Sequence, residues 1–115
     1  MNTRDVQLAA SAVANGAGVA AVIFSGPGVT YERIDIGAIQ LNGASALLPT
    51  ARLFRGRGSN NGTLLAIELD GNTGAFIGGG PGDALTGTDT FAVEWTGATP
   101  GAVMSAVLTG VLTRT

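Results

Sequence analysis

The sequence lacks cysteine and histidine, and it also lacks lysine, so all six of its cationic side chains are arginine. Without histidine or cysteine the chain has no Ser-His-Asp triad, thiol nucleophile, zinc finger, thiolate-bound cluster or ordinary haem site. Without lysine it has neither Schiff-base chemistry nor a phosphate-binding P-loop. We therefore expect a protein that is not an enzyme and that works without a cofactor or a bound metal.

Charge is scarce as well: 12% of the residues are charged and the net charge is −2. Binding to nucleic acid requires many cations against the phosphates, so we expect no nucleic-acid partner. The longest apolar stretch, residues 16–24, is much shorter than a membrane-spanning helix. The sequence therefore predicts a soluble chain with no membrane partner.

Small apolar residues and glycine are abundant: 45% of the 115 residues are hydrophobic, 5% are aromatic, and 19 are glycine. This length suits a single domain over residues 1–115, and folding would bury about 65% of the unfolded surface. A core of small branched side chains suits the thin layer between two sheets. The mean hydropathy of +0.36 predicts exposed apolar surface, and hence an oligomer or a subunit of something larger.

Turn signals recur about every ten residues, which is typical of short strands joined by tight turns. They include Asn15-Gly16, Gly26-Pro27-Gly28, Asn42-Gly43 and Asp70-Gly71. The predicted fold is all-β: a single antiparallel β-sandwich of jelly-roll type with seven or eight strands.

Alternation of side chains predicts which faces of two strands are buried. In residues 88–95, Phe91, Val93 and Trp95 share one face, which we expect to enter the core. The same pattern in residues 63–69 places Leu65, Ile67 and Leu69 inward and Glu68 outward.

The C-terminal strand, residues 102–113, is apolar on both faces. Val103, Val107 and Val111 lie on one face, and Met104, Leu108 and Leu112 lie on the other. Such a strand is either central in the sandwich or part of a subunit interface. We expect one of the two rows to pack against another subunit, and we assign this role to the valines or their opposite-face neighbours.

Three further elements follow from glycine and proline. Residues 6–14 and 19–24 are predicted to form a hairpin around Asn15-Gly16, and a bulge is expected near Gly37. Pro49 makes residues 47–54 an edge strand or a kinked one.

Arg52, Arg55 and Arg57 place half of the cations within six residues, beside a glycine-rich loop. Arginine binds carboxylates and phosphates with two parallel hydrogen bonds, so these residues form a candidate docking site for an acidic partner surface. The alternative is a solvated loop that keeps an apolar protein in solution.

Two other patterns partly match a calcium-binding loop and a glycoside-hydrolase active site, and both matches are incomplete. Residues 70–74 begin like a calcium-binding loop, but Pro81 stands where that loop needs a bidentate glutamate, so a turn is the better interpretation. Glu68 and Glu94 form the best pair of carboxylates for glycoside hydrolysis, yet the chain has one Trp and one Tyr with which to bind a sugar. We assign no catalytic residue.

Three stretches carry a resemblance to a protein family: AVANGAGVA at residues 12–20, YERI at 31–34, and VEWTGATPGA at 93–102. Together they resemble small β-rich virion proteins of tailed phages that infect actinobacteria. The all-arginine usage and the abundant alanine and glycine agree with a high-GC genome. Members of this group are assigned to the virion as capsid decoration or minor tail components, and the resemblance brings no catalytic residues.

The resemblance implies a virion structural protein, assembled in the host cytoplasm. The leading hypothesis is a decoration or minor capsid protein that binds the major capsid protein on the head surface and stabilises the shell. It would associate with itself, as a trimer or another ring. The alternatives are a minor tail or receptor-binding component that contacts tail proteins, and a carbohydrate-binding module.

Overall fold

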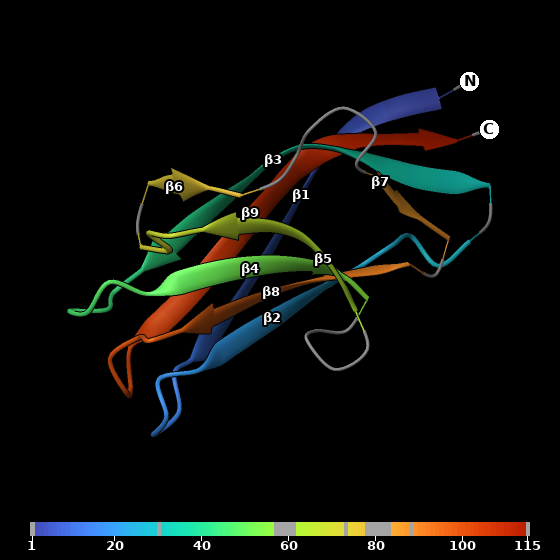
Figure 1. Ribbon diagram of the computed structural model, residues 1–115. Helices are drawn as coiled ribbons and strands as arrows, with labels where there is room; N and C mark the ends of the chain where they lie inside the picture. The colour runs from blue at the N-terminus through green and yellow to red at the C-terminus, as the bar shows by residue number, and fades with distance from the viewer. Residues whose placement is uncertain are drawn as a thin grey trace.

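The chain forms two antiparallel β-sheets packed face to face (Figure 1), in a computed structural model that describes residues 2–29, 31–56, 62–72, 74–77, 84–87 and 89–114. No helix occurs within these ranges. The strands are β1 (Asn2–Val13), β2 (Ala20–Ser25), β3 (Glu32–Gly43), β4 (Thr50–Arg55), β5 (Thr63–Glu68), β6 (Ala75–Phe76), β7 (Ala84–Thr86), β8 (Thr90–Thr96) and β9 (Val103–Arg114).

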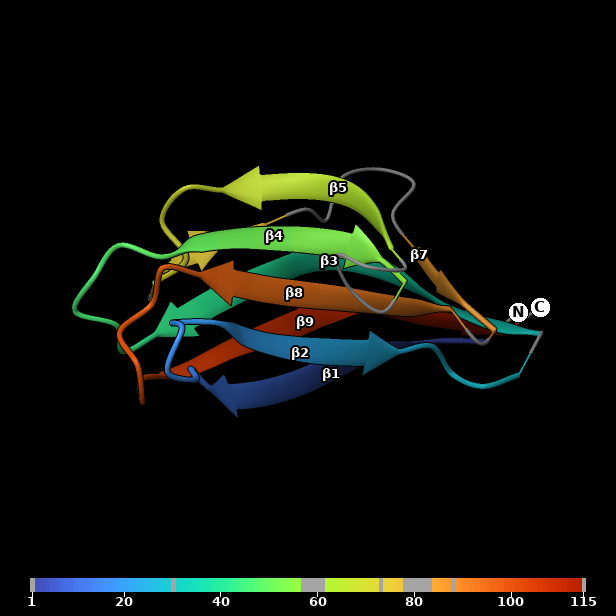
Figure 2. The ribbon, with the colours of Figure 1, turned by 60° about the horizontal axis from the view of Figure 1, so that its bottom comes forward.

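The strand order is that of a jelly roll. One sheet runs β1-β9-β3, with the short strands β6 and β7 both paired to β3; the other runs β2-β8-β4-β5. When β6 and β7 are taken as two pieces of one interrupted strand, the first strand pairs with the last, the second with the last but one, and so on inward to β4 and β5. These nested pairs make the eight-stranded double sheet of a jelly roll. The predicted antiparallel sandwich is confirmed, and Figure 2 shows its two layers.

The core lies between the sheets and is centred on β8. Phe91, Val93 and Trp95 are fully buried, which confirms the predicted inward face. The indole Nε1–H of Trp95 donates a hydrogen bond of 3.0 Å to the carbonyl oxygen of Gly71. This bond ties the segment after β5 to the centre of the sandwich.

The two apolar rows of β9 lie on opposite faces of the strand, as predicted. Met104, Leu108 and Leu112 are buried in the core. Val103 and Val111 are 51% and 38% exposed on the outer face of the five-stranded sheet. β9 lies between β1 and β3, so it is central in its sheet, and the described residues leave the valine face of β9 partly exposed.

The hairpin predicted around Asn15-Gly16 is wrong. The turn itself is present, because the N–H of Asn15 donates to the carbonyl of Val19 at 3.0 Å. However, β1 pairs with β9 and β2 pairs with β8, so the turn carries the chain from one sheet to the other. Local turn chemistry specifies the reversal of the chain but does not decide whether the two strands share a sheet.

The inward face predicted for residues 63–69 is also wrong. Leu65, Ile67 and Leu69 are 38%, 52% and 72% exposed, whereas Ala66 packs against the core. In the observed register Ala66 pairs with the buried Leu53, and Ile67 pairs with Arg52 on the outer face. The expected register differs by one residue, which exchanges the two faces of a strand.

The bulge expected near Gly37 is confirmed, because the pairing of β3 with β9 shifts between Ile36 and Ala38. Of the two alternatives expected from Pro49, the edge strand is wrong, because β4 lies between β8 and β5. Pro49 precedes the first residue of β4, so its missing N–H interrupts no ladder, and its carbonyl oxygen accepts a hydrogen bond from the N–H of Gly71 at 2.9 Å.

Candidate interaction surfaces

An apolar row crosses the outer face of the four-stranded sheet. The strand registers place Ile23 beside Ala92, Ala92 beside Phe54, and Phe54 beside Leu64. Ala92 and Phe54 face outward but are only 1% and 6% exposed, because neighbouring side chains cover them. The row is therefore a packed surface, with Ile23 and Leu64 exposed on either side of it.

The next row on this face contains Arg52, which lies between Glu94 on β8 and Ile67 on β5. The Arg52 guanidinium donates from Nη1 to the hydroxyl oxygen of Thr96 at 3.0 Å. Ile67 is 52% exposed. Aliphatic and aromatic side chains around an arginine are the composition found at the centre of protein interfaces. We call this surface, comprising Ile23, Phe54, Leu64, Ile67 and Arg52, the apolar face.

Arg55 does not join Arg52 on this surface. It lies opposite the buried Phe91, on the other side of β4, at the end of the sandwich. Its guanidinium lies 4.9 Å from the centre of the Phe91 ring and 3.6 Å from the Asp89 carboxylate. Arg57, the third member of the predicted docking group, lies outside the described residues. Of the predicted docking group, Arg52 thus lies on a face of the sandwich and Arg55 lies at its end.

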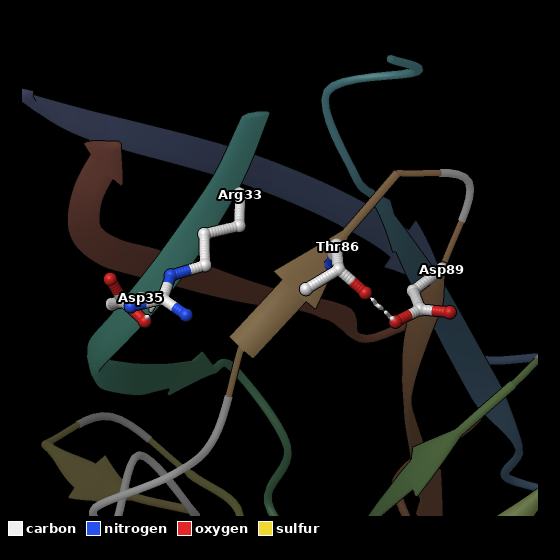
Figure 3. Close-up of polar contacts among 4 residues, drawn as sticks. All are labelled: Arg33, Asp35, Thr86 and Asp89. Atoms are coloured by element: carbon white, nitrogen blue, oxygen red, sulfur yellow. Dashed lines mark hydrogen bonds and ion pairs between the residues drawn. The ribbon is translucent and has the colours of Figure 1, made fainter. Parts of the chain in front are cut away.

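Asp89 organises the turn between β7 and β8. Its carboxylate accepts a hydrogen bond of 2.6 Å from the hydroxyl of Thr86 and is also the partner of Arg55. Figure 3 shows the Thr86–Asp89 bond beside a second pair, Arg33 and Asp35 on β3, whose charged atoms are 3.3 Å apart. Arg33 and Arg55 are thus each paired with a carboxylate of the same chain.

The predicted valine row lies on the outer face of the other sheet. Val103 is paired with Val13 of β1, which is 62% exposed, and Val107 and Val111 follow along β9. Beside Val111 is an open hollow of about 480 Å³, where Gly37 and Gly110 present no side chain. The remaining residues that line it are Asp5, Val6, Gln7 and Thr109. The valines and the apolar face therefore lie on opposite sides of the sandwich.

A smaller hollow of about 240 Å³ lies near the two ends of the chain, and Thr3, Arg4, Glu32, Leu112 and Arg114 line it. Arg114 is held on two sides, by the Glu32 carboxylate at 3.3 Å and by the Tyr31 ring at 5.7 Å. This geometry stabilises the end of the sheet.

The two glutamates considered for glycoside hydrolysis do not come together. Glu94 is on the outer face beside Arg52, whereas Glu68 is opposite Ala51, which faces the core. Asp70 has the role expected in a turn, since its carboxylate accepts the N–H of Asn72 at 3.1 Å. Among the described residues, no three acidic side chains gather as metal ligands would.

The sequence pattern does not identify Ile23, Leu64 and Ile67 as exposed residues. Alternation along residues 63–69 places Ile67 inward, and the pattern assigns Ile23 and Leu64 to neither face. The available signal was the run Leu64-Leu65-Ala66-Ile67, which is apolar at every position and so exceeds what a strand with one buried face requires.

No model of a protein family matches this chain, and a search of curated proteins finds no match either. Within the described ranges there is also no helix long and apolar enough to cross a membrane.

Proposed function

We propose that this protein is a structural subunit of a bacteriophage virion, bound to the outside of the head as a decoration or minor capsid protein. The observation that carries the proposal is the apolar face, an exposed surface with the composition of an interface centre. The resemblance of three stretches to small phage virion proteins supports the choice of the virion. Jelly rolls occur in viral capsid proteins and also in lectins and cupins, so the fold agrees with this function without selecting it.

The apolar face would dock on the shell. Ile23, Leu64 and Ile67 would lose water on contact, and Arg52 would present its remaining donors to a carboxylate of the major capsid protein. Because such a subunit binds the assembled shell and not its dissociated parts, it stabilises the shell by mass action. The valine face on the opposite side would remain for association between subunits.

The first test is the copy number in purified particles made by the genome that encodes the chain, measured by quantitative mass spectrometry. Hundreds of copies per particle, located on the head by immunogold labelling, are expected. A handful of copies at the tail would replace the decoration role with the minor tail role. Absence from the particles would refute both.

The second test uses, on each sheet, one arginine variant and one variant of an exposed apolar residue. Arg52→Ala and Ile67→Ser change the apolar face, whereas Arg33→Ala and Phe76→Ser change the opposite sheet. Ile67 and Phe76 are similarly exposed, at 52% and 56%. The first pair should lower occupancy on particles at least tenfold, and the second pair should leave it unchanged. Equal effects of the two pairs would refute docking through the apolar face.

A further inference from the structure

Within the part of the chain that the structure describes, β1 forms a free edge of the five-stranded sheet. Figure 2 shows it at the margin of the molecule, with β9 on its inner side. All 12 residues of β1 pair with β9 in one unbroken register. The other edges of the described sheets are shorter or interrupted: β2 and β5 have 6 residues each, β5 adjoins a bulge, and β6 and β7 are two separate pieces.

Over residues 6–13, β1 has none of the features that usually keep an edge strand from pairing; the inward-facing Arg4 precedes this stretch. Natural edges are protected by proline, lysine, bulges, short length or charges that point inward at the core. Between Asn2 and Val13 there is no proline, glycine or lysine, and the charged residues, Arg4 and Asp5, lie together near the N-terminal end. Residues 6–13 form an uncharged, regular edge.

The main-chain groups along this edge can be assigned from the ladder. The N–H of Ala14 donates to the carbonyl of Ala102, in the same register that pairs β1 with β9. In an antiparallel ladder alternate residues bond to the same neighbour, so the even-numbered residues of β1 bond to β9. The odd-numbered residues therefore direct their N–H and C=O groups to the free edge. These are Thr3, Asp5, Gln7, Ala9, Ser11 and Val13.

The inward side chains of β1 indicate an incomplete core margin. Val6, Leu8, Ala10 and Ala12 pack against the core but are only partly buried. A further strand beside β1 would cover these side chains on one side of the sheet and satisfy the free main-chain groups. The chemistry of the edge therefore requires an extended chain as its partner.

We propose that the partner is β1 of a second copy, paired antiparallel about a two-fold axis that passes beside Leu8. This register joins residues 3–13 of both copies and places the odd-numbered residues opposite one another, as the free main-chain groups require. Asp5 then faces Ser11 of the second copy, and Arg4 faces Ala12. A parallel, in-register pair would instead bring Asp5 against Asp5, which is repulsive.

Such a pair joins two five-stranded sheets into one continuous sheet with a two-fold axis, the commonest symmetry of protein dimers. Both valine rows then lie on the same side of this sheet. The inference does not depend on the virion proposal, because the pairing is a property of the purified chain alone. Failure of one leaves the other standing.

The test is the mass of the purified protein by analytical ultracentrifugation, from micromolar to millimolar concentration. A mass of twice 11.4 kDa is expected for the wild type. Ala9→Pro removes an N–H that β9 does not use, so the monomer should fold while the dissociation constant rises at least tenfold. Ala9→Ser keeps that N–H and should remain dimeric. A monomeric or trimeric wild type, or a dimer that is indifferent to Ala9→Pro, would overturn the inference.

A pair of charge variants tests the register without introducing proline. Position 7 lies opposite position 9 of the second copy, so Gln7→Lys combined with Ala9→Lys places like charges together and should weaken the dimer at low salt. Gln7→Lys combined with Ala9→Glu places opposite charges together and should preserve it. The same effect from both combinations would refute this register, even if Ala9→Pro proved unfolded by circular dichroism.

Discussion

The buried hydrogen bond of Trp95 gives the sharpest test of the packing. Its indole is fully buried and bonds to the Gly71 carbonyl at 3.0 Å. Trp95→Phe keeps a large aromatic ring but removes the donor, so the buried carbonyl of Gly71 loses this partner. An orphaned buried acceptor costs about 1–3 kcal/mol, and the smaller ring costs about 1 kcal/mol more through lost packing. We expect the free energy of unfolding to fall by about 2–4 kcal/mol.

This loss converts into a shift of the melting temperature. At about 2.1 cal/mol/K per residue, a chain of 115 residues has an unfolding entropy of about 0.24 kcal/mol/K. The variant should therefore melt about 8–17 °C below the wild type, as measured by differential scanning calorimetry and checked by urea denaturation. Val93→Ala is the control, because this buried side chain lies in the same row and makes no hydrogen bond. A loss below about 1 kcal/mol for Trp95→Phe would refute the argument that the indole donor matters.

Two other predictions concern stability. A methyl group at Gly110 would overlap the carbonyl oxygen of Asp35, whereas one at Gly16 would meet nothing within 4 Å. Gly110→Ala should thus cost more than about 2 kcal/mol in urea denaturation and Gly16→Ala almost nothing; equal costs would contradict the pairing of β3 with β9. Asp89→Ala removes an exposed ion pair to Arg55 and a turn hydrogen bond. It should cost about 1 kcal/mol, and high salt should reduce that cost; a salt-independent loss would show that the ion pair contributes nothing.

The sequence predicts the sandwich well wherever the two faces of a strand differ in chemistry. Phe91, Val93 and Trp95 alternate with polar or small residues, so their burial follows from the pattern alone. In β9 both faces are apolar, and the sequence still separates the two rows, although which row enters the core depends on the rest of the sheet. Periodicity reports the faces of a strand, and burial is decided by the neighbours that cover them.

Long-range pairing is what the sequence leaves open. The Asn15-Gly16 turn is correctly located, yet it joins two sheets, because β1 finds its partner about a hundred residues away in β9. Nothing local distinguishes that outcome from a hairpin. The same holds for Arg52 and Arg55, which are close in sequence but leave β4 on opposite sides. Because the two arginines are close in sequence, they are predicted to form a single docking site. The alternation of side chains along β4 places them on different faces instead.

β5 is where the mismatch between sequence and structure is most informative. Its alternation would bury Leu65, Ile67 and Leu69, and the observed register turns the partly buried Ala66 toward the core instead. The strand turns a small alanine toward the core and larger apolar side chains toward water. The hydrophobic effect alone would favour the opposite arrangement, because the larger side chains bury more apolar area. Departures of this kind are expected at functional sites, where local preference yields to another requirement. Ile67 belongs to the apolar face, so an interface that covers this face would bury the side chain that the folded chain leaves exposed.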